Sequence, residues 1–361
     1  MKKTALFDFH LQKQAKMIVY ANFMMPEQFS GIIKEHNSVR TDVGVFDCSH
    51  MGEFILEGKE SLNFLNYVLS NDYTSLEIGK IRYGLLLDES GYVLDDLMVY
   101  KLKETIYMLV VNASNIDKDF VHLVKYTNEF DVKLRDVSNE HSLISIQGPN
   151  ANQMLEKLLH GVSKLKFMQF DHFAFHQGTL LVSRSGYTGE DGFEVYGKEK
   201  EIVQLYDQLV NVESVLPCGL GSRDTLRFEA GLPLYGHEIN GYITPLEARL
   251  ESFCHFDKDF IGRDALLILK KNGVKKRLVG LELLEKNIAR EGYMVFKNDK
   301  NVGYITTGYM IPMTNKVYAN ALIDAGISLG DVVEINIRNK MIKAKVRNRK
   351  YYTKKYVKGD K

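Results

Sequence analysis

Two arginines four residues apart, Arg223 and Arg227, lie in a segment that carries more charge than a buried core segment would. The glycines before them predict a turn, Ser222 predicts a helix N-cap, and Gly231 predicts the end of that helix. At this spacing both arginines lie on one face of the helix. Because neighbouring guanidinium groups repel each other, each needs a carboxylate of the protein or an anionic ligand. The segment therefore predicts an anion-binding site.

An ordinary surface helix would explain the same residues. Asp224 would then neutralise Arg223, and Glu229 would neutralise Arg227. The charge pattern taken alone favours this second interpretation.

A pair of adjacent acids, Asp95 and Asp96, lies in residues 92–100, which alternate in the manner of a β-strand. Successive strand side chains point to opposite faces, so one carboxylate should face water and the other should face inward. Burying a lone carboxylate is costly, so the inward one should be paired, protonated or functional. Two solvated acids at a hairpin are the alternative, but the flanking leucines leave little room for a loop.

Residues 183–194 combine small, aromatic and acidic side chains: Gly186, Gly189, Gly192, Tyr187, Phe193, Glu190, Asp191 and Glu194. Glycine allows the backbone to approach a flat ligand closely, and the aromatic rings offer flat faces. Carboxylates would repel a phosphate, and no Lys-Ser or Lys-Thr pair follows the glycines as it does in a nucleotide loop. A heteroaromatic ligand with N–H donors, such as a pterin, suits these residues better.

The order of the expected elements predicts two helix-and-sheet units followed by a β domain. In the first unit we expect helices at residues 26–34, 60–70 and 117–130 and strands at residues 83–88, 92–100 and 105–112. In the second we expect strands at residues 143–148, 178–184 and 192–196 and helices at residues 149–159 and 198–209. After a turn at residues 272–273, strands at 277–282, 293–297, 301–309, 316–322 and 331–346 indicate a β-barrel or jelly roll.

Composition excludes several classes of protein. The 361 residues suffice for two or three domains, and a net charge of +1 gives no bulk attraction to nucleic acid. The three cysteines are widely spaced, which favours reduced thiols, and the histidines form no ligand-spaced cluster, so we expect no metal. Without a long apolar run or a secretory signal, we expect a cytoplasmic protein that does not bind membranes.

The C-terminal segment, residues 338–361, is rich in lysine and arginine and also carries tyrosines. Such a segment could bind nucleic acid. A solvated terminus or a landing surface for an acidic partner is the simpler interpretation.

Five segments in sequence order resemble the aminomethyltransferase family, which includes the T-protein of the glycine cleavage system. They are residues 47–52, 92–100, 111–119, 183–194 and 217–238, and Asp-Lys-Asp-Phe-Ile-Gly follows at residues 257–262. The resemblance runs from about residue 4 to the end of the chain. It implies an α+β fold in which three domains form a cloverleaf around a cavity that holds tetrahydrofolate. The implied division is a discontinuous folate-binding domain (1–50 and 136–245), a second α+β domain (51–135), a helical linker (246–275) and a β domain (276–361).

The resemblance also implies roles for individual residues. Asp96 would be the essential carboxylate beside the reacting folate nitrogens. Asn112 and Glu194 would bind the pterin, and Arg223 would bind the anionic glutamate end. The other implied residues are Met51, Tyr83 and Tyr187 in the walls, Arg227 as a second candidate or as support for Arg223, and Tyr356 at the rim.

The implied activity is transfer of the one-carbon unit of an aminomethyl group from the lipoyl arm of H-protein to tetrahydrofolate. Ammonia and 5,10-methylenetetrahydrofolate would be the products, with glycine decarboxylase and dihydrolipoyl dehydrogenase as indirect partners. A folate-dependent demethylase acting on a small methylated donor and a non-catalytic folate-binding protein are the alternatives. The chain departs from the family at residues 21–26, which lack a Gly-Trp pair, and at Ile311, which replaces a serine before proline. These departures bear on the fit of H-protein more than on the chemistry.

Overall fold

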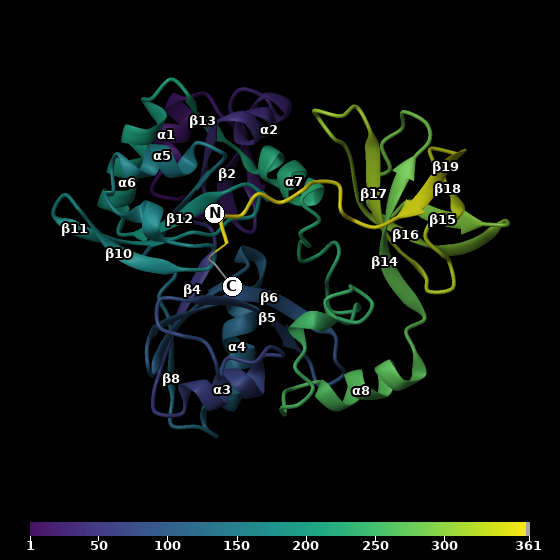
Figure 1. Ribbon diagram of the computed structural model, residues 1–361, viewed down its shortest axis with the longest axis horizontal. Coiled ribbons are helices and arrows are strands. Elements are labelled where there is room, and N and C mark those ends of the chain that lie inside the picture. The colour runs from purple at the N-terminus through teal and green to yellow at the C-terminus, as the bar shows by residue number, and fades with distance from the viewer. Residues whose placement is uncertain (359–361) are drawn as a thin grey trace.

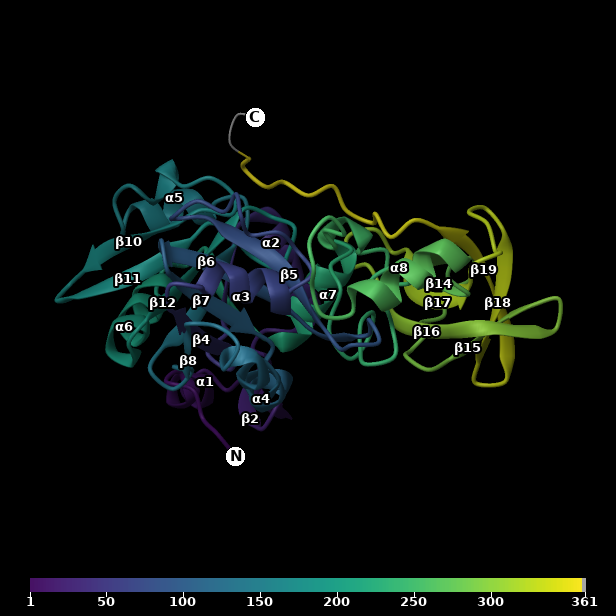
Figure 2. The ribbon, with the colours of Figure 1, turned by 90° about the horizontal axis from the view of Figure 1, so that it is seen from below.

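Two helix-covered sheets and a closed barrel surround helix α7 (Leu220–Glu229) in the computed structural model, which describes residues 1–358. The barrel lies at one end of the molecule in both views (Figure 1, Figure 2). This mixed helix and sheet architecture with a C-terminal barrel confirms the predicted fold class. The domain bounds given above stay a prediction.

The first sheet is assembled from segments that lie far apart in the sequence. Strand β3 pairs in antiparallel fashion with β9 on one side and in parallel with β13 on the other. The buried face of the sheet packs against α5 and α6 through an aliphatic core that includes Ile144, Val195 and Leu205. The strands, in sheet order, are β10 (Phe170–Phe175), β11 (Gly178–Ser183), β12 (Gly192–Gly197), β9 (Ser142–Gln147), β3 (Val43–Asp47) and β13 (Val215–Cys218). The helices of this unit are α1 (Phe7–Gln12), α2 (Ile32–Thr41), α5 (Ala151–Glu156), α6 (Glu199–Val210) and α7, with a 3₁₀ turn at Val162–Lys164.

The second sheet is antiparallel throughout and is formed by one continuous stretch of chain. In sheet order its strands are β5 (Ile81–Leu87), β6 (Val93–Lys103), β7 (Ile106–Val111), β4 (Gly52–Glu57) and β8 (Lys133–Asp136). Helices α3 (Ser61–Val68) and α4 (Ile116–Thr127) cover it, with a 3₁₀ turn at Ala113–Asn115. The alternation of β6 separates the two acids, because Asp95 is fully buried whereas Asp96 is half-buried at the other face.

The barrel closes where its last strand pairs with its first. The strands run in the order β14 (Lys276–Leu283), β17 (Val317–Asp324), β16 (Lys300–Met310), β15 (Met294–Lys297), β18 (Val332–Ile337) and β19 (Lys340–Arg347). The single strand predicted at residues 331–346 is wrong. Arg338 and Asn339 adopt positive φ values of 50° and 67°, which form a tight turn between two antiparallel strands. Helix α8 (Arg263–Asn272) and a 3₁₀ turn at Glu251–Phe253 precede the barrel.

The helix predicted at residues 26–34 is also wrong. Strands β1 (Lys16–Tyr20) and β2 (Phe23–Gln28) form a two-stranded hairpin, and Pro26 lies in β2. An edge strand tolerates proline, because its missing N–H need not join a ladder. Helix α2 begins only at Ile32, after Gly31 reverses the chain with a φ of 105°.

The chain beyond the barrel returns to the first sheet unit. Figure 1 shows this segment in yellow, running from β19 past α7 toward β12. The backbone N–H of Lys355 donates to Gly189, and that of Phe167 donates to Val357. The basic segment is therefore not a free tail, since residues 340–347 form a barrel strand and residues 352–357 pack on the first sheet unit. Lysines of this segment, including Lys343 and Lys358, are nevertheless exposed, and the landing surface for an acidic partner stays a prediction. Within residues 1–358 no helix combines the length and apolarity needed to span a membrane.

Candidate functional site

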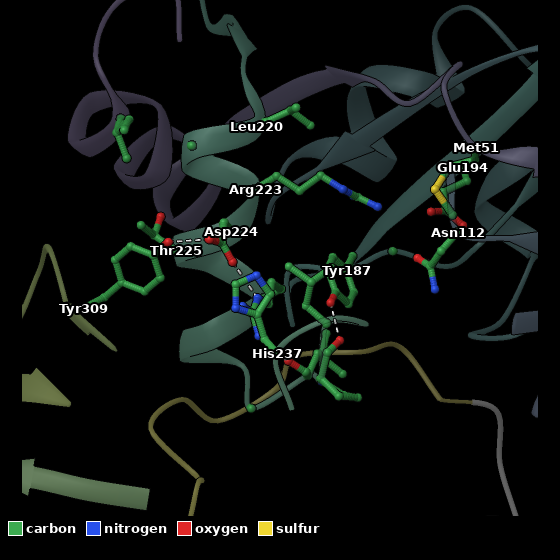
Figure 3. A pocket seen from close by; sticks show the side chains of 18 of the residues that line it. Met51, Asn112, Tyr187, Glu194, Leu220, Arg223, Asp224, Thr225, His237 and Tyr309 are labelled. Atoms are coloured by element: carbon green, nitrogen blue, oxygen red, sulfur yellow. Dashed lines mark hydrogen bonds and ion pairs between the residues drawn. The ribbon is translucent and has the colours of Figure 1, made fainter. Parts of the chain in front are cut away.

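A cavity of about 1540 Å³ opens between the two sheet units, α7 and the barrel. Its wall is formed by residues from both sheet units, the barrel and the end of the chain: β1, β5, β6, β12, α7, β16 and the C-terminal segment. Figure 3 shows Arg223 extending from α7 toward the part of the wall that carries Met51, Asn112 and Glu194. Every residue assigned above to the site lines this cavity: Met51, Tyr83, Asp96, Asn112, Tyr187, Glu194, Arg223, Arg227 and Tyr356.

The two arginines of α7 have different surroundings. The Arg227 side chain is fully buried, and its nitrogens contact Asp224 at 2.6 Å, Glu238 at 2.5 Å and Thr307 at 3.3 Å. The guanidinium of Arg223 lies over the ring of Tyr187, 4.8 Å from its centroid, and its Nη1 is buried with no hydrogen-bond partner among residues 1–358. Arg223 is therefore the arginine whose charge is available to a ligand in the cavity.

The ion pairs that the nearby carboxylates form are not those that the surface-helix interpretation predicts. Asp224 binds Arg227 rather than Arg223, and Glu229 binds Arg40 and His36 instead of Arg227. The predicted N-cap is wrong as well, because Gly219 occupies the cap and Ser222 lies inside the helix, where its hydroxyl donates to Gly219. Position 219 requires glycine because the backbone of residue 27 passes close by. A Cβ on residue 219 would lie only 2.3 Å from the carbonyl oxygen of Glu27.

Asp96 faces the cavity from the middle of β6 and is held by two neighbours. The hydroxyl of Tyr83 donates to one carboxylate oxygen at 3.0 Å, and Nδ2 of Asn112 donates to the other at 2.8 Å. Burial and the negative charge of Asp95 raise the pKa of Asp96 to about 7, although the hydrogen bonds from Tyr83 and Asn112 act in the opposite direction. Asp96 can therefore gain or lose a proton near neutral pH, as a general acid or base requires.

Of the three acids in residues 183–194, Glu194 alone lines the cavity. Its carboxylate accepts a hydrogen bond of 2.7 Å from the hydroxyl of Ser185. Glu190 binds Arg40 at 3.3 Å, and Asp191 binds Arg184 at 2.5 Å. The prediction that all three acids are available to a ligand is therefore wrong, because ion pairs within the first sheet unit occupy two of them.

Glycine plays a similar divided role in this segment. Gly186 lines the cavity, and a Cβ on it would meet the Gln147 side chain at 2.1 Å. A Cβ on Gly192, which does not line the cavity, would meet Gln147 and the backbone of β9 at 2.5 Å. Gly192 therefore serves the packing of β12 against β9, and only part of the predicted glycine approach concerns the ligand.

The C-terminal segment forms part of the rim. The rings of Tyr356 and Phe167 stack with centroids 4.1 Å apart and an interplanar angle of 8°. The hydroxyl of Tyr352 donates to Glu190, and the guanidinium of Arg40 lies 3.9 Å from the Tyr352 ring centroid. These contacts fix Tyr356 and Lys354 at the cavity wall.

Some wall residues gave no usable signal in the sequence. Tyr20 and Phe253 line the cavity from β1 and from a 3₁₀ turn, in segments with no recognisable site pattern. His50 and His237 also line it. Burial and the nearby Arg223 charge lower the pKa of His50 to about 4, so it is neutral at physiological pH. Among residues 1–358 no three His, Cys, Asp or Glu side chains gather in a way that could hold a metal ion.

Comparison with known proteins shows the family of the chain. Residues 6–258 match the GCVT N-terminal domain family, and residues 276–352 match the glycine cleavage T-protein C-terminal barrel domain. The chain belongs to the glycine cleavage T-protein family of aminomethyltransferases. Aminomethyltransferases of Thermosipho melanesiensis and Thermoanaerobacter pseudethanolicus are 43% and 44% identical to it, over 98% and 99% of this chain and 97% and 99% of theirs.

A solved structure of the family has the same fold. The crystal structure of glycine cleavage system aminomethyltransferase T from Bartonella henselae covers 99% of each chain with a TM-score of 0.94 at 33% identity. Membership in this family of aminomethyltransferases makes the chain a transferase and confirms the predicted enzyme class. The roles of the individual site residues stay predictions.

Proposed function

We propose that the protein transfers the one-carbon unit of an aminomethyl group, carried on the lipoyl arm of H-protein, to tetrahydrofolate. Ammonia, 5,10-methylenetetrahydrofolate and dihydrolipoyl H-protein are the products. Membership in the glycine cleavage T-protein family supports this assignment, and the cavity walls carry charges suited to both reactants.

The observation that carries the proposal is the charge arrangement of the cavity. Arg223 provides a buried cationic group with an unpaired Nη1 among residues 1–358, and Glu194 and Asp96 provide carboxylates elsewhere on the wall. Tetrahydrofolate has the complementary arrangement, with N–H donors on its pterin and carboxylates on its glutamate. Arg223 would hold the glutamate end, and Glu194 with Asn112 would hold the pterin.

The size of the cavity supports two reactants. Small-ligand pockets usually measure about 300–1,000 Å³, whereas this cavity measures about 1540 Å³. Apolar side chains at its wall, including Ile18, Ile33, Met310 and Pro312, would accommodate the apolar part of a lipoyl arm. H-protein would deliver that arm, and glycine decarboxylase and dihydrolipoyl dehydrogenase would act on H-protein before and after the transfer.

Asp96 performs the acid–base and electrostatic part of the reaction. As an anion it stabilises the positive charge that develops on the aminomethyl carbon and nitrogen when the thiolate leaves. Its proton affinity near neutrality also suits it to accept a proton from a nitrogen and return one to the departing ammonia. Tyr83 and Asn112 hold the carboxylate in place, and Met51 and Tyr187 fill the wall on either side.

The test is a reconstituted reaction. The purified full chain is mixed with aminomethylated H-protein and tetrahydrofolate, and ammonia and 5,10-methylenetetrahydrofolate are measured. Both products should form in equal amounts and depend on both substrates. If neither product forms while a small methylated amine is demethylated in the presence of tetrahydrofolate, the donor is a small molecule and the proposal is wrong.

A further inference from the structure

Asp119 is a buried acid whose carboxyl group receives no hydrogen bond. It lies in the first turn of α4, its side chain is fully buried, and neither Oδ1 nor Oδ2 has a donor among residues 1–358. Asn115, four residues earlier and therefore on the same side of the helix start, donates from its Nδ2 to Asp95 Oδ1 at 2.7 Å, which places Asp119 on the side that faces Asp95. Two ionised carboxylates that face each other in a buried site would repel each other and leave all four oxygens as acceptors.

A single proton resolves this arrangement. Asp95 already accepts hydrogen bonds from Asn115 Nδ2 at 2.7 Å, Asn112 Nδ2 at 2.8 Å and the Asn112 backbone N–H at 3.2 Å. These three donors stabilise the ionised form of Asp95. Asp119 has no such donors, so the proton belongs on Asp119, whose O–H can donate to Asp95.

The surroundings of Asp119 favour the same assignment. The charged groups that influence it are Asp95 and Asp96 of β6 and Lys118 of its own helix. Lys118 directs its ammonium group to the Leu94 carbonyl and the Tyr235 hydroxyl. Burial and the Asp95 charge raise the pKa of Asp119 to about 11, so the proton remains through the physiological range.

The pair is connected to the cavity through Asn112. Nδ2 of Asn112 contacts Asp95 Oδ1 at 2.8 Å and Asp96 Oδ1 at 2.8 Å. With its N–H groups directed to two carboxylates, Asn112 leaves its Oδ1 as the atom available to a ligand in the cavity. The ionised Asp95 also contributes the negative charge that Asp96 experiences from behind.

We propose that Asp119 is a positioning residue that keeps a proton and donates a hydrogen bond from its O–H to ionised Asp95, and that this acid–carboxylate pair orients Asn112 and keeps a negative charge behind Asp96. Asp119 itself does not line the cavity. The consequence for catalysis rests on the proposed role of Asp96, whereas the position of the proton does not.

The proton can be observed without turnover. Infrared spectra of the full chain with ¹³C-labelled aspartate, recorded at about pH 9, should show the C=O stretch of one protonated aspartic acid. At this pH Asp96 is ionised, and the isotope label separates aspartate from the buried Glu53. The band should disappear in Asp119→Asn. Its absence from the unaltered protein, or its persistence in the variant, would overturn the proposal.

Kinetics separate positioning from mere packing. Asp119→Asn keeps an N–H donor for Asp95, so its kcat should stay within about threefold and its pH profile should not move. Asp119→Ala removes the donor, so the Asp95 carboxylate is no longer held in place and can move away from Asp96, which decreases the negative charge behind Asp96. Its kcat should fall about tenfold or more, with the acid limb of its pH profile displaced to lower pH.

Asp117→Asn is the matched control, because Asp117 is an exposed acid of the same helical turn. A lower melting temperature of Asp119→Ala with an unmoved pH profile would show a structural role alone and refute the positioning role. If the alanine variant does not fold, Asp119→Leu, whose side chain has the same number and branching of heavy atoms as aspartate and leaves no cavity, takes its place. A failure of the unaltered enzyme to turn over would refute the proposed function and leave the infrared result to decide where the proton lies.

Discussion

Replacing Asp96 by asparagine should slow the reaction and stabilise the folded protein at the same time. The two side chains have nearly the same shape, and the introduced amide can still accept a hydrogen bond from Tyr83 or Asn112. The charge that the cavity uses is lost, and loss of one such electrostatic group lowers kcat by a factor of about 10²–10³. Folate affinity should change little, because Arg223 and Glu194 are untouched.

The gain in stability follows from the pKa. The folded state raises the pKa of Asp96 from 3.8 to about 7, so it binds this proton more tightly than the unfolded chain does. Ionisation of Asp96 therefore costs the folded state no stability below pH 3.8, the pKa in the unfolded chain. The cost grows as the pH rises and is complete above about pH 7, the pKa in the folded state. At about 1.4 kcal/mol for each pKa unit, the full cost approaches ~4 kcal/mol. Water in the cavity reduces it, and we expect ~2 kcal/mol.

Urea unfolding at two pH values measures this cost. The free energy of unfolding of Asp96→Asn should exceed that of the unaltered protein by ~2 kcal/mol near pH 8. Near pH 4 most of the difference should vanish, because the cost of ionisation is lost only as the pH approaches the unfolded pKa of 3.8. Asp117→Asn controls for loss of one exposed charge. If the variant is no more stable near pH 8, or if its advantage is the same at both pH values, the burial of charge at Asp96 does not have the energetic cost inferred here.

Three further variants test other parts of the site. Arg223→Ala should weaken tetrahydrofolate binding about 10–100-fold in calorimetry with little loss of stability, and unchanged affinity would shift the contact to another cation. Glu238→Gln removes one of the two carboxylates that pair with the buried Arg227, the one that is itself fully buried, and should lower the free energy of unfolding by ~3 kcal/mol at neutral pH. Burial opposes ionisation of Glu238, but the Arg227 charge outweighs burial and lowers the pKa of Glu238 from 4.5 to about 2. The stability that this pair contributes is therefore fully present above pH 4.5 and is lost as the pH falls toward 2. A Glu238→Gln variant whose stability depends on acid pH in the same way as that of the unaltered protein would contradict this. Tyr356→Ala removes the stack on Phe167 and should weaken folate binding about fivefold, whereas a loss of stability without any change in affinity would confine Tyr356 to packing.

Strand alternation and motif chemistry predicted much of the site. The strand alternation of residues 92–100 predicted that Asp95 and Asp96 lie on opposite faces. In the structure Asp95 is buried and Asp96 lines the cavity. That prediction depends only on local geometry. The helix around Arg223 was predicted for the same reason, since glycine and the spacing of charged residues act within a few turns of chain.

The choice between the two arginines could not come from local sequence. Glu238 lies 11 residues from Arg227, beyond the one or two turns over which helical spacing acts. Thr307 lies 80 residues away in barrel strand β16, so it meets Arg227 only where the barrel packs against α7. The same holds for Glu190, whose partner Arg40 is distant in sequence. Spacing identifies candidate charged residues, but long-range ion pairs decide which of them a ligand can reach.

The edge proline shows a further limit. Pro26 suits the first turn of a helix as well as an edge strand, and nothing within a few residues distinguishes the two. The pairing of Met17 with Pro26 across the β1–β2 hairpin decided the outcome.

The position of β3 between β9 and β13 in the first sheet affects how the chain folds. Both of its neighbours are synthesised much later, β9 from Ser142 and β13 from Val215, after the whole second sheet has been made. Closing such long loops slows formation of a sheet, whereas the second sheet uses contacts between strands close in sequence. Pulse-labelled hydrogen exchange during refolding should therefore protect β5 to β7 before β3. Until β3 is paired, its apolar residues remain exposed to other chains, so the newly made protein is most prone to aggregation during this interval.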